Sequence, residues 1–107
     1  MSKPDKVLSM IGICTKAGKV KSGEFAVEAA IKDQKAQLVV VATDASEATK
    51  KSYRDSCDHY RVDLREYGTK EELGMACGKE FRAAVAIMDS GMADSVIAKM
   101  EEQIWQK

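Results

Sequence analysis

The apolar positions near the start of this chain follow a helical spacing. They recur at i, i+3, i+4 and i+7, which is one face of a helix, in Val7, Met10, Ile11 and Cys14. This helix should end near Ala17, because Gly18 suits the left-handed position that follows many helices. Residues 19–21 then fit a brief strand.

A second helix is predicted to run from Ser22, which can serve as its N-cap, through about Gln34. Glu24 lies in the first turn, where a negative charge interacts favourably with the helix dipole. When the residues are projected at about 100° each, one mostly apolar face should be buried. Its members are Val27, Ala30, Ile31 and Gln34.

The middle of the chain continues the alternation of strand and helix. Residues 36–43 are apolar and largely β-branched, as a central strand covered on both faces requires. Asp44 and Ser46 open a helix, and residues 62–65 alternate like a further strand. The inward face of that helix is predicted to contain Tyr53, Cys57 and Tyr60.

The last third begins with a capping box, in which Thr69 and Glu72 start a helix that Gly78 closes. The inward face of this helix is predicted to be Leu73, Ala76 and Cys77. Residues 83–88 indicate another buried strand, and Asp89 or Ser90 can cap a final helix. The inward positions of that helix are Ala93, Val96, Ile97, Met100 and Ile104.

Helices and strands thus alternate throughout the 107 residues, without an internal repeat or a long linker. A chain of this length has room for one hydrophobic core, so residues 1–107 are expected to form a single domain. The pattern predicts an α/β fold, a three-layer α/β/α sandwich around a mixed sheet of about four strands.

Composition and charge limit the function. The 17 Lys and Arg residues balance 17 Asp and Glu residues, so any affinity for phosphate must come from local placement. Residues 6–23 contain four lysines and no acidic residue. The three cysteines are widely spaced, and there is neither an apolar leader nor a run of membrane-spanning length. We therefore expect a cytoplasmic protein that does not bind a membrane.

No catalytic or metal site is predicted. His59 is the only histidine, and it follows Cys57 by two positions. On a helix this separation places the two side chains about 200° apart around the axis. A structural zinc usually needs four ligands, and no second Cys/His pair is present. The sequence also lacks a phosphate-binding loop, a dinucleotide fingerprint and a nucleophile elbow. The expectation is a protein that is not an enzyme and uses no cofactor, metal or small-molecule substrate.

The second helix presents an aromatic ring on its outer face. Phe25, Ala29 and Lys32 project away from the predicted core, and Phe25 lies in the first turn, directly after the basic segment. A ring beside the free N–H groups of a helix start suits a stacked base and a bound phosphate. Alternatively, a neighbouring loop such as the one after Gly78 covers Phe25, and the lysines are ordinary solvated side chains.

Several segments, in this order, resemble a known family. Residues 73–78 (L-G-M-A-C-G) are similar to the L-G-x-A-C-G segment of the L-seven-Ae family of ribosomal, kink-turn RNA-binding proteins. Residues 21–25, and 38–43 followed by 44–46, resemble the glycine-led helix, central strand and A-x-D-A segment of that family. Residues 10–19, 22–24 and 78–80 look most like its bacterial YlxQ-like branch.

The resemblance implies the three-layer fold and the binding of a kink-turn, an RNA bend that contains tandem sheared G·A pairs. It implies contacts from the start of the second helix, the loop before the third helix and the loop after the L-G-x-A-C-G helix. Together with the basic segment and the outer helix face, the candidate RNA-binding residues are Lys19, Lys21, Ser22, Gly23, Glu24, Phe25, Ala26, Glu28, Lys32, Ser46, Lys79, Glu80 and Phe81.

The chain departs from the family at positions that reach the RNA. Better-studied members have Asn-Glu and then a Lys three residues later, where this chain has Phe25, Ala26 and Ala29. Glu24 or Glu28 would then supply the base-edge hydrogen bonds. Residues 79–81 replace an apolar-Ser-Arg stretch, so the rings at 25 and 81 would pack on each other or stack on RNA.

Two functions remain open from the sequence. The first is a monomeric, ribosome-associated or structured-RNA-binding module, whose RNA is ribosomal or another kink-turn-like RNA. The second is a protein-interaction module that keeps the fold but has lost specific kink-turn recognition.

Overall fold

The computed structural model describes residues 5–105, with side chains through Gln103. Helices and strands alternate along this part of the chain, as predicted. The elements are α1 (Lys6–Lys16), β1 (Val20–Ser22), α2 (Glu24–Lys32), β2 (Leu38–Val41), α3 (Glu47–Tyr60), β3 (Asp63–Glu66), α4 (Lys70–Ala76), β4 (Ala84–Ile87) and α5 (Ser90–Trp105).

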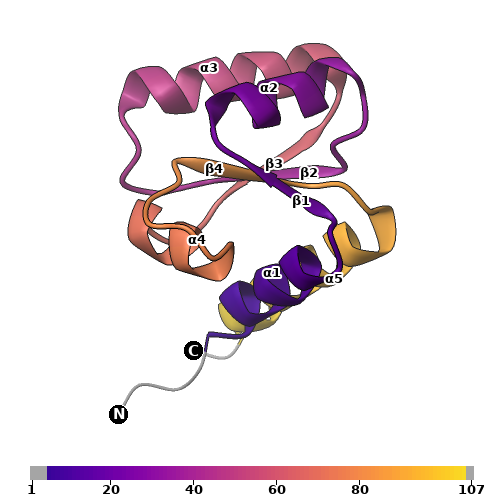
Figure 1. The fold of residues 1–107 in the computed structure, drawn as a ribbon, viewed down its shortest axis with the longest axis vertical. Coiled ribbons are helices and arrows are strands. Elements are labelled where there is room, and N and C mark those ends of the chain that lie inside the picture. Colours follow the sequence, from indigo (N-terminus) through magenta and orange to yellow (C-terminus); the bar gives the residue numbers. More distant parts are fainter. Residues whose placement is uncertain (1–4, 106–107) are drawn as a thin grey trace.

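The strands form one mixed sheet in the order β1-β4-β2-β3. β4 is antiparallel to both β1 and β2, whereas β3 is parallel to β2. α2 and α3 cover one face of this sheet, and α1, α4 and α5 cover the other (Figure 1). The predicted three-layer α/β/α sandwich with a mixed four-stranded sheet is therefore confirmed.

The sheet topology gathers three connections at one edge. β1, β2 and β3 run in one direction and β4 runs against them, so the C-terminal ends of the first three strands lie beside the N-terminal end of β4. In the register, Ser22 pairs with Val85 and Val41 pairs with Ala84. The start of α2, the loop after β2 and the loop before β4 therefore share this edge.

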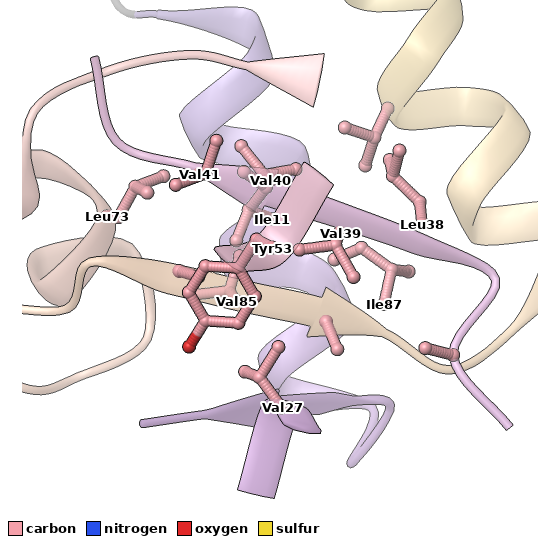
Figure 2. Packing of buried hydrophobic residues seen from close by; sticks show 14 of the residues in the cluster. Ile11, Val27, Leu38, Val39, Val40, Val41, Tyr53, Leu73, Val85 and Ile87 are labelled. Atoms are coloured by element: carbon pink, nitrogen blue, oxygen red, sulfur yellow. The ribbon is translucent and has the colours of Figure 1, made fainter. Parts of the chain in front are cut away.

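The central strands β2 and β4 are buried along their whole length, because helices cover both faces of the sheet. Their side chains pack against residues of the helices on each side, among them Ile11, Val27 and Tyr53 (Figure 2). Burial of this kind is the main stabilising contribution to such a fold. The prediction of central strands covered on both sides is confirmed, although β2 is shorter than residues 36–43.

Two details of the predicted second helix are wrong. Ser22 is the last residue of β1, and Gly23 is the N-cap of α2, because the pairing of β1 with β4 continues through Ser22. At the other end α2 stops at Lys32. Gln34 is exposed and has a φ of 59°, so the chain turns there toward β2 and Gln34 is not part of the buried face.

The remaining helix starts follow the sequence closely. Ser46 caps α3, and Thr69 forms the predicted capping box of α4. Asp44 has a different role from the one expected, because its carboxylate accepts a hydrogen bond of 2.8 Å from the Lys70 N–H. At the start of α5, the Asp89 carboxylate accepts a hydrogen bond from the N–H of Met92 in the first turn.

Most of the predicted inward faces are also found. The buried positions are Tyr53, Cys57, Leu73, Cys77, Ala93, Val96 and Met100. Tyr60, Ala76 and Ile97 are half-buried. The side chain of Ile104, which was also expected to face inward, lies outside the described part of the chain.

The hydroxyl group of Tyr67 connects the end of β3 to two helices. It donates to the Asp5 carboxylate at 2.6 Å and lies 2.6 Å from Oε1 of Gln103. Burial, followed by the hydrogen bond to Asp5, raises the pKa of Tyr67 to about 12. Because the folded pKa exceeds that of a free tyrosine, this stabilising contribution is complete below pH 10 and is lost as the pH rises toward 12.

We expect Tyr67→Phe to lower the free energy of unfolding by about 1–3 kcal/mol at neutral pH, since it removes a hydrogen bond to a charged acceptor. Urea denaturation at pH 7 measures this loss. Tyr60→Phe is the matched control, because the Tyr60 hydroxyl makes no hydrogen bond within the described residues. Equal stability of the two variants would contradict the role given to the Tyr67 hydroxyl.

Candidate functional site

α2 is the one described helix whose first turn lacks a side-chain cap. The other four start with a side-chain oxygen that accepts from a backbone N–H, from Asp5, Ser46, Thr69 and Asp89. The N-cap of α2 is Gly23, which has no side chain that could accept such a hydrogen bond. The N–H groups of residues 24–26 donate to no other group within residues 5–105. They are therefore free hydrogen-bond donors at the positive end of the helix dipole.

Gly23 keeps this helix start open. Its φ of 92° and ψ of 150° lie in a region that residues with a side chain rarely adopt. A Cβ added to Gly23 would meet nothing within 4 Å, so the glycine is required by the backbone conformation and not by crowding. The space beside the Cα of Gly23 is therefore open.

Phe25 stands in the open beside these donors. Its side chain is 94% exposed, so the alternative in which the loop after Gly78 covers it is wrong. Phe81, on that loop, is 59% exposed, and the two rings form no aromatic pair in the described structure. Of the two alternatives for these rings, packing on each other is therefore not found, and both rings are available to a partner.

The loop before β4 is held tightly against α4. A Cβ on Gly74 would lie 2.3 Å from the backbone oxygen of Glu80, which shows how closely the two segments approach. The Lys79 N–H donates to the Gly74 carbonyl at 2.8 Å. Lys79, Glu80 and Phe81 are all exposed, so a rigidly positioned loop presents them at the same sheet edge as Gly23.

Arg82 joins this loop to the end of β1, directly before α2, and it was not among the residues predicted from the sequence. Its Nε–H donates to Oγ of Ser22 at 3.3 Å, and its Nη1–H donates to the Phe81 carbonyl at 2.7 Å. The two hydrogen-bonded side chains are 60 positions apart in the sequence. No local signal distinguishes Arg82 from an ordinary surface arginine, so only the strand pairing could have shown its position.

The lysines near the site are free of ion pairs. Within the described residues, Lys19, Lys21, Lys32 and Lys79 have no acidic partner within 4 Å, whereas Lys50 of α3 contacts two carboxylates. A free ammonium group can interact with a phosphate without first losing an acidic partner. The charge expected from the basic segment is thus available.

Not all of these lysines lie at the first turn of α2. Lys21 lines a hollow that extends along α2 from Ala26 to Asp33, so it lies beside the helix and not specifically at its first turn. The carbonyl of Lys19 accepts from the N–H that follows β4, which places Lys19 at the opposite end of β1. Lys32 is the last residue of α2, about 12 Å along the helix axis from the first turn.

Ser46 and Glu28 have hydrogen-bond partners of their own, whereas Glu24 does not within the described residues. The Ser46 hydroxyl accepts from the Thr49 N–H at 3.1 Å, although the residue lies in the loop after β2, at the site edge. Glu28 is half-buried, and its carboxylate accepts a hydrogen bond of 3.1 Å from the Ser56 hydroxyl. Glu24 is exposed in the first turn.

The three cysteines are free and buried, and burial raises the pKa of each thiol, that of Cys57 to about 11. His59 is exposed while Cys57 is buried, which agrees with their predicted separation on α3. Within residues 5–103, no three His, Cys, Asp or Glu side chains gather as a metal site would require. None of the described helices combines the length and the apolar character of a membrane span.

Comparison with known proteins shows the family of this chain. Residues 5–97 match the model of the ribosomal protein L7Ae/L30e/S12e/Gadd45 family. The chain belongs to this family. The match extends from the start of α1 into α5, and it confirms the resemblance seen in residues 73–78 and in the glycine-led start of α2.

Two bacterial proteins are similar to this chain over most of their length. RNA-binding protein YlxQ of Bacillus subtilis is 36% identical over 92 residues, which are 86% of this chain and 92% of the relative. RNA-binding protein YlxQ of Enterococcus faecium is 39% identical over 88 residues, 82% of this chain and 84% of the relative. A solved structure of a Bacillus halodurans protein of unknown function has a TM-score of 0.87 and 30% identity, covering 92% of this chain and 99% of that one.

Proposed function

We propose that this chain is a non-catalytic, cytoplasmic RNA-binding protein that holds a bent, kink-turn-like RNA at the uncapped first turn of α2. Ribosomal RNA is the first candidate, because the family contains ribosomal proteins. The observation that carries the proposal is the set of free N–H donors at residues 24–26, in open space beside Gly23. Two relatives named as RNA-binding proteins support it.

The arrangement of the site suits a bent RNA better than a straight duplex. Free N–H groups at a helix start bind a phosphate oxygen, and the exposed ring of Phe25 offers a stacking surface for an unpaired base. The loop before β4 lies across the same sheet edge, where Lys79 can contact a second stretch of backbone. A sharp bend brings two backbone segments and splayed bases to one place, as these separate contacts require.

Gel-shift titrations of a kink-turn RNA and an unbent duplex of equal length, at two salt concentrations, test this function. Both RNAs should lose affinity as salt rises, because phosphate contacts release counterions. The preference for the kink-turn should remain at the higher salt, because it comes from shape and base contacts. Equal and weak binding to both RNAs, with the same steep salt dependence, would exclude specific recognition.

A second candidate function is a protein-interaction module that uses the exposed rings of Phe25 and Phe81 as anchors. A pull-down from a nuclease-treated lysate separates the two functions. A protein partner that stays bound after the RNA has been removed supports the interaction module. Loss of all partners on nuclease treatment supports RNA binding.

We expect Phe25→Ala to weaken kink-turn binding by about 1–3 kcal/mol, because a stacked base loses its aromatic surface. The stability of the fold should hardly change, since the ring is exposed. Met75→Ala is the matched control, an exposed apolar side chain on α4. Titration of both variants against the same RNA measures the difference, and unchanged affinity in Phe25→Ala would favour the protein-interaction module.

A further inference from the structure

β3 forms one edge of the sheet, and its outer side has no partner strand within the described chain. In a strand that pairs on one side, the backbone groups of successive residues point alternately toward the neighbouring strand and away from it. The Tyr67 N–H donates to the Val41 carbonyl of β2, which sets the phase of this alternation. The N–H and C=O groups of Leu64 and Glu66 therefore point outward, away from β2.

These outward backbone groups are free or held by one exposed side chain. The N–H groups of Leu64 and Glu66 donate to no other group within the described residues. The Leu64 carbonyl accepts a hydrogen bond of 3.0 Å from Nη1 of Arg65, whose side chain is exposed and can turn away. Hollows lie on both sides of the strand, one beside α5 and one beside α3. An accessible edge of this kind is a template for pairing with another strand.

Two opposite charges flank Leu64 on this strand. Asp63 and Arg65 are both exposed, and neither forms an ion pair within residues 5–103. They point to the same face of the sheet, because side chains two positions apart share a face, and Arg65 lines the hollow beside α5. Leu64 points to the other face, where it lines a hollow with Arg54 and Asp58 of α3. A strand with this pattern can be complementary to a second copy of itself.

One antiparallel register of two β3 strands places opposite charges together. The outward groups of one copy must meet the outward groups of the other, so the two-fold axis has to pass through a residue position. With the axis at Leu64, each Asp63 lies directly opposite the Arg65 of the other copy, and the two leucines face each other. With the axis at Asp63, Arg65 or Glu66, two like charges would lie directly opposite each other, which is unfavourable.

The helix beside the strand favours the same register. α3 connects the parallel strands β2 and β3, so it runs antiparallel to β3. Arg54 therefore lies near the end of β3, 3.8 Å from the Glu66 carboxylate, and Asp58 lies near its start, where it shares a hollow with Val62. With the axis at Leu64, Arg54 of one copy is on the side of Asp58 of the other. A second set of opposite charges thus faces across the axis.

We propose that two copies of this chain associate through β3, in antiparallel pairing about a two-fold axis at Leu64. The N–H groups of Leu64 and Glu66 then donate to the Leu64 and Val62 carbonyls of the other copy, once Arg65 has released the first of these. Reciprocal ion pairs between Asp63 and Arg65 fix the register. The interface is small, so the dimer is weak, and the monomer expected from the sequence describes the dilute protein.

This dimer leaves the first turn of α2 free. β1, which leads into α2, lies at the opposite edge of the sheet from β3. Because the two β3 strands are antiparallel, the uncapped turns of the two copies face opposite ends of the dimer. The association therefore needs no RNA, and it is independent of the function proposed above.

Sedimentation velocity of the protein without RNA, between about 10 µM and 1 mM, tests the association over the range expected for a small interface. The unaltered chain should change from monomer to dimer, and added salt should weaken the dimer because exposed ion pairs are screened. Over the same range, the amides of Leu64 and Glu66 should gain protection from solvent exchange. A chain that stays monomeric throughout overturns the proposal, whether its edge strand is unused or takes an extended segment of another protein.

Charge reversal tests the register. Asp63→Lys and Arg65→Glu should each weaken the dimer about tenfold or more, because each places like charges opposite each other. An equimolar mixture of the two variants should dimerise again, since the reversed charge of each copy then faces an opposite charge on the other. Asp33→Lys, an exposed change at the end of α2, is the control and should dimerise as the unaltered chain does. Association that survives both reversals, or a mixture that stays monomeric, would show that β3 does not pair in this way.

Discussion

Gly74→Ala is expected to lower the free energy of unfolding by about 3 kcal/mol or more, as overpacking against rigid neighbours does. The new Cβ would lie 2.3 Å from the carbonyl oxygen of Glu80, 2.6 Å from its carbonyl carbon and 2.9 Å from the Phe81 nitrogen. These are backbone atoms, so they cannot rotate away as the end of a long side chain would. The loop before β4 must shift, and kink-turn affinity should fall with it.

Gly12→Ala is the control for this substitution. Gly12 lies in α1, where a Cβ would make an ordinary contact of 3.7 Å with the Ala76 carbonyl oxygen. Alanine has a higher helix propensity than glycine, so the free energy of unfolding of this variant should rise by about 0.5–1 kcal/mol. Urea denaturation of both variants should show a loss of stability for Gly74→Ala and a gain for Gly12→Ala. If Gly74→Ala is as stable as Gly12→Ala, the close packing of α4 on this loop is not a feature of the folded protein in solution.

Gly23→Ala is expected to weaken kink-turn binding at least about tenfold, and to lower stability by about 1–3 kcal/mol. Alanine does not readily adopt a φ of 92° with a ψ of 150°, so the first turn of α2 would rearrange and its N–H donors would change direction. The added methyl group would also stand in the open space that the RNA backbone is proposed to enter. Gel-shift titration and urea denaturation measure the two effects.

Gly18→Ala separates loss of binding from loss of stability. Gly18 also has a positive φ, 73°, and a Cβ there would meet nothing within 4 Å. It ends α1 and lies at the opposite end of β1 from Gly23. This variant should lose a similar amount of stability and keep its RNA affinity. The same affinity in both variants would show that Gly23 has no special role in binding.

The fold was largely predictable because its signals are local. The capping box at Thr69 and the apolar run in residues 38–41 depend on neighbours a few positions away, and both are found. Ser22 was misassigned for the opposite reason. Its side chain is a good helix cap, but pairing with Val85, far away in the sequence, keeps it in β1 and leaves the capping position to Gly23.

The site was predictable only in part. Helical projection correctly placed Phe25 on the outer face of α2, since this depends on one helix alone. The hydrogen bond between Arg82 and Ser22 depends on how distant elements pack, so the sequence did not reveal it. Sequence proximity also misplaced Lys19, which lies at the opposite end of β1 from Gly23.

The most direct test is an amide NMR titration of the ¹⁵N-labelled protein with a kink-turn RNA. We expect the N–H signals of residues 24–26, which have no hydrogen-bond partner in the described chain, to shift most strongly and to gain protection from solvent exchange as the RNA binds. Binding that leaves these three amides unchanged and perturbs another surface would contradict it.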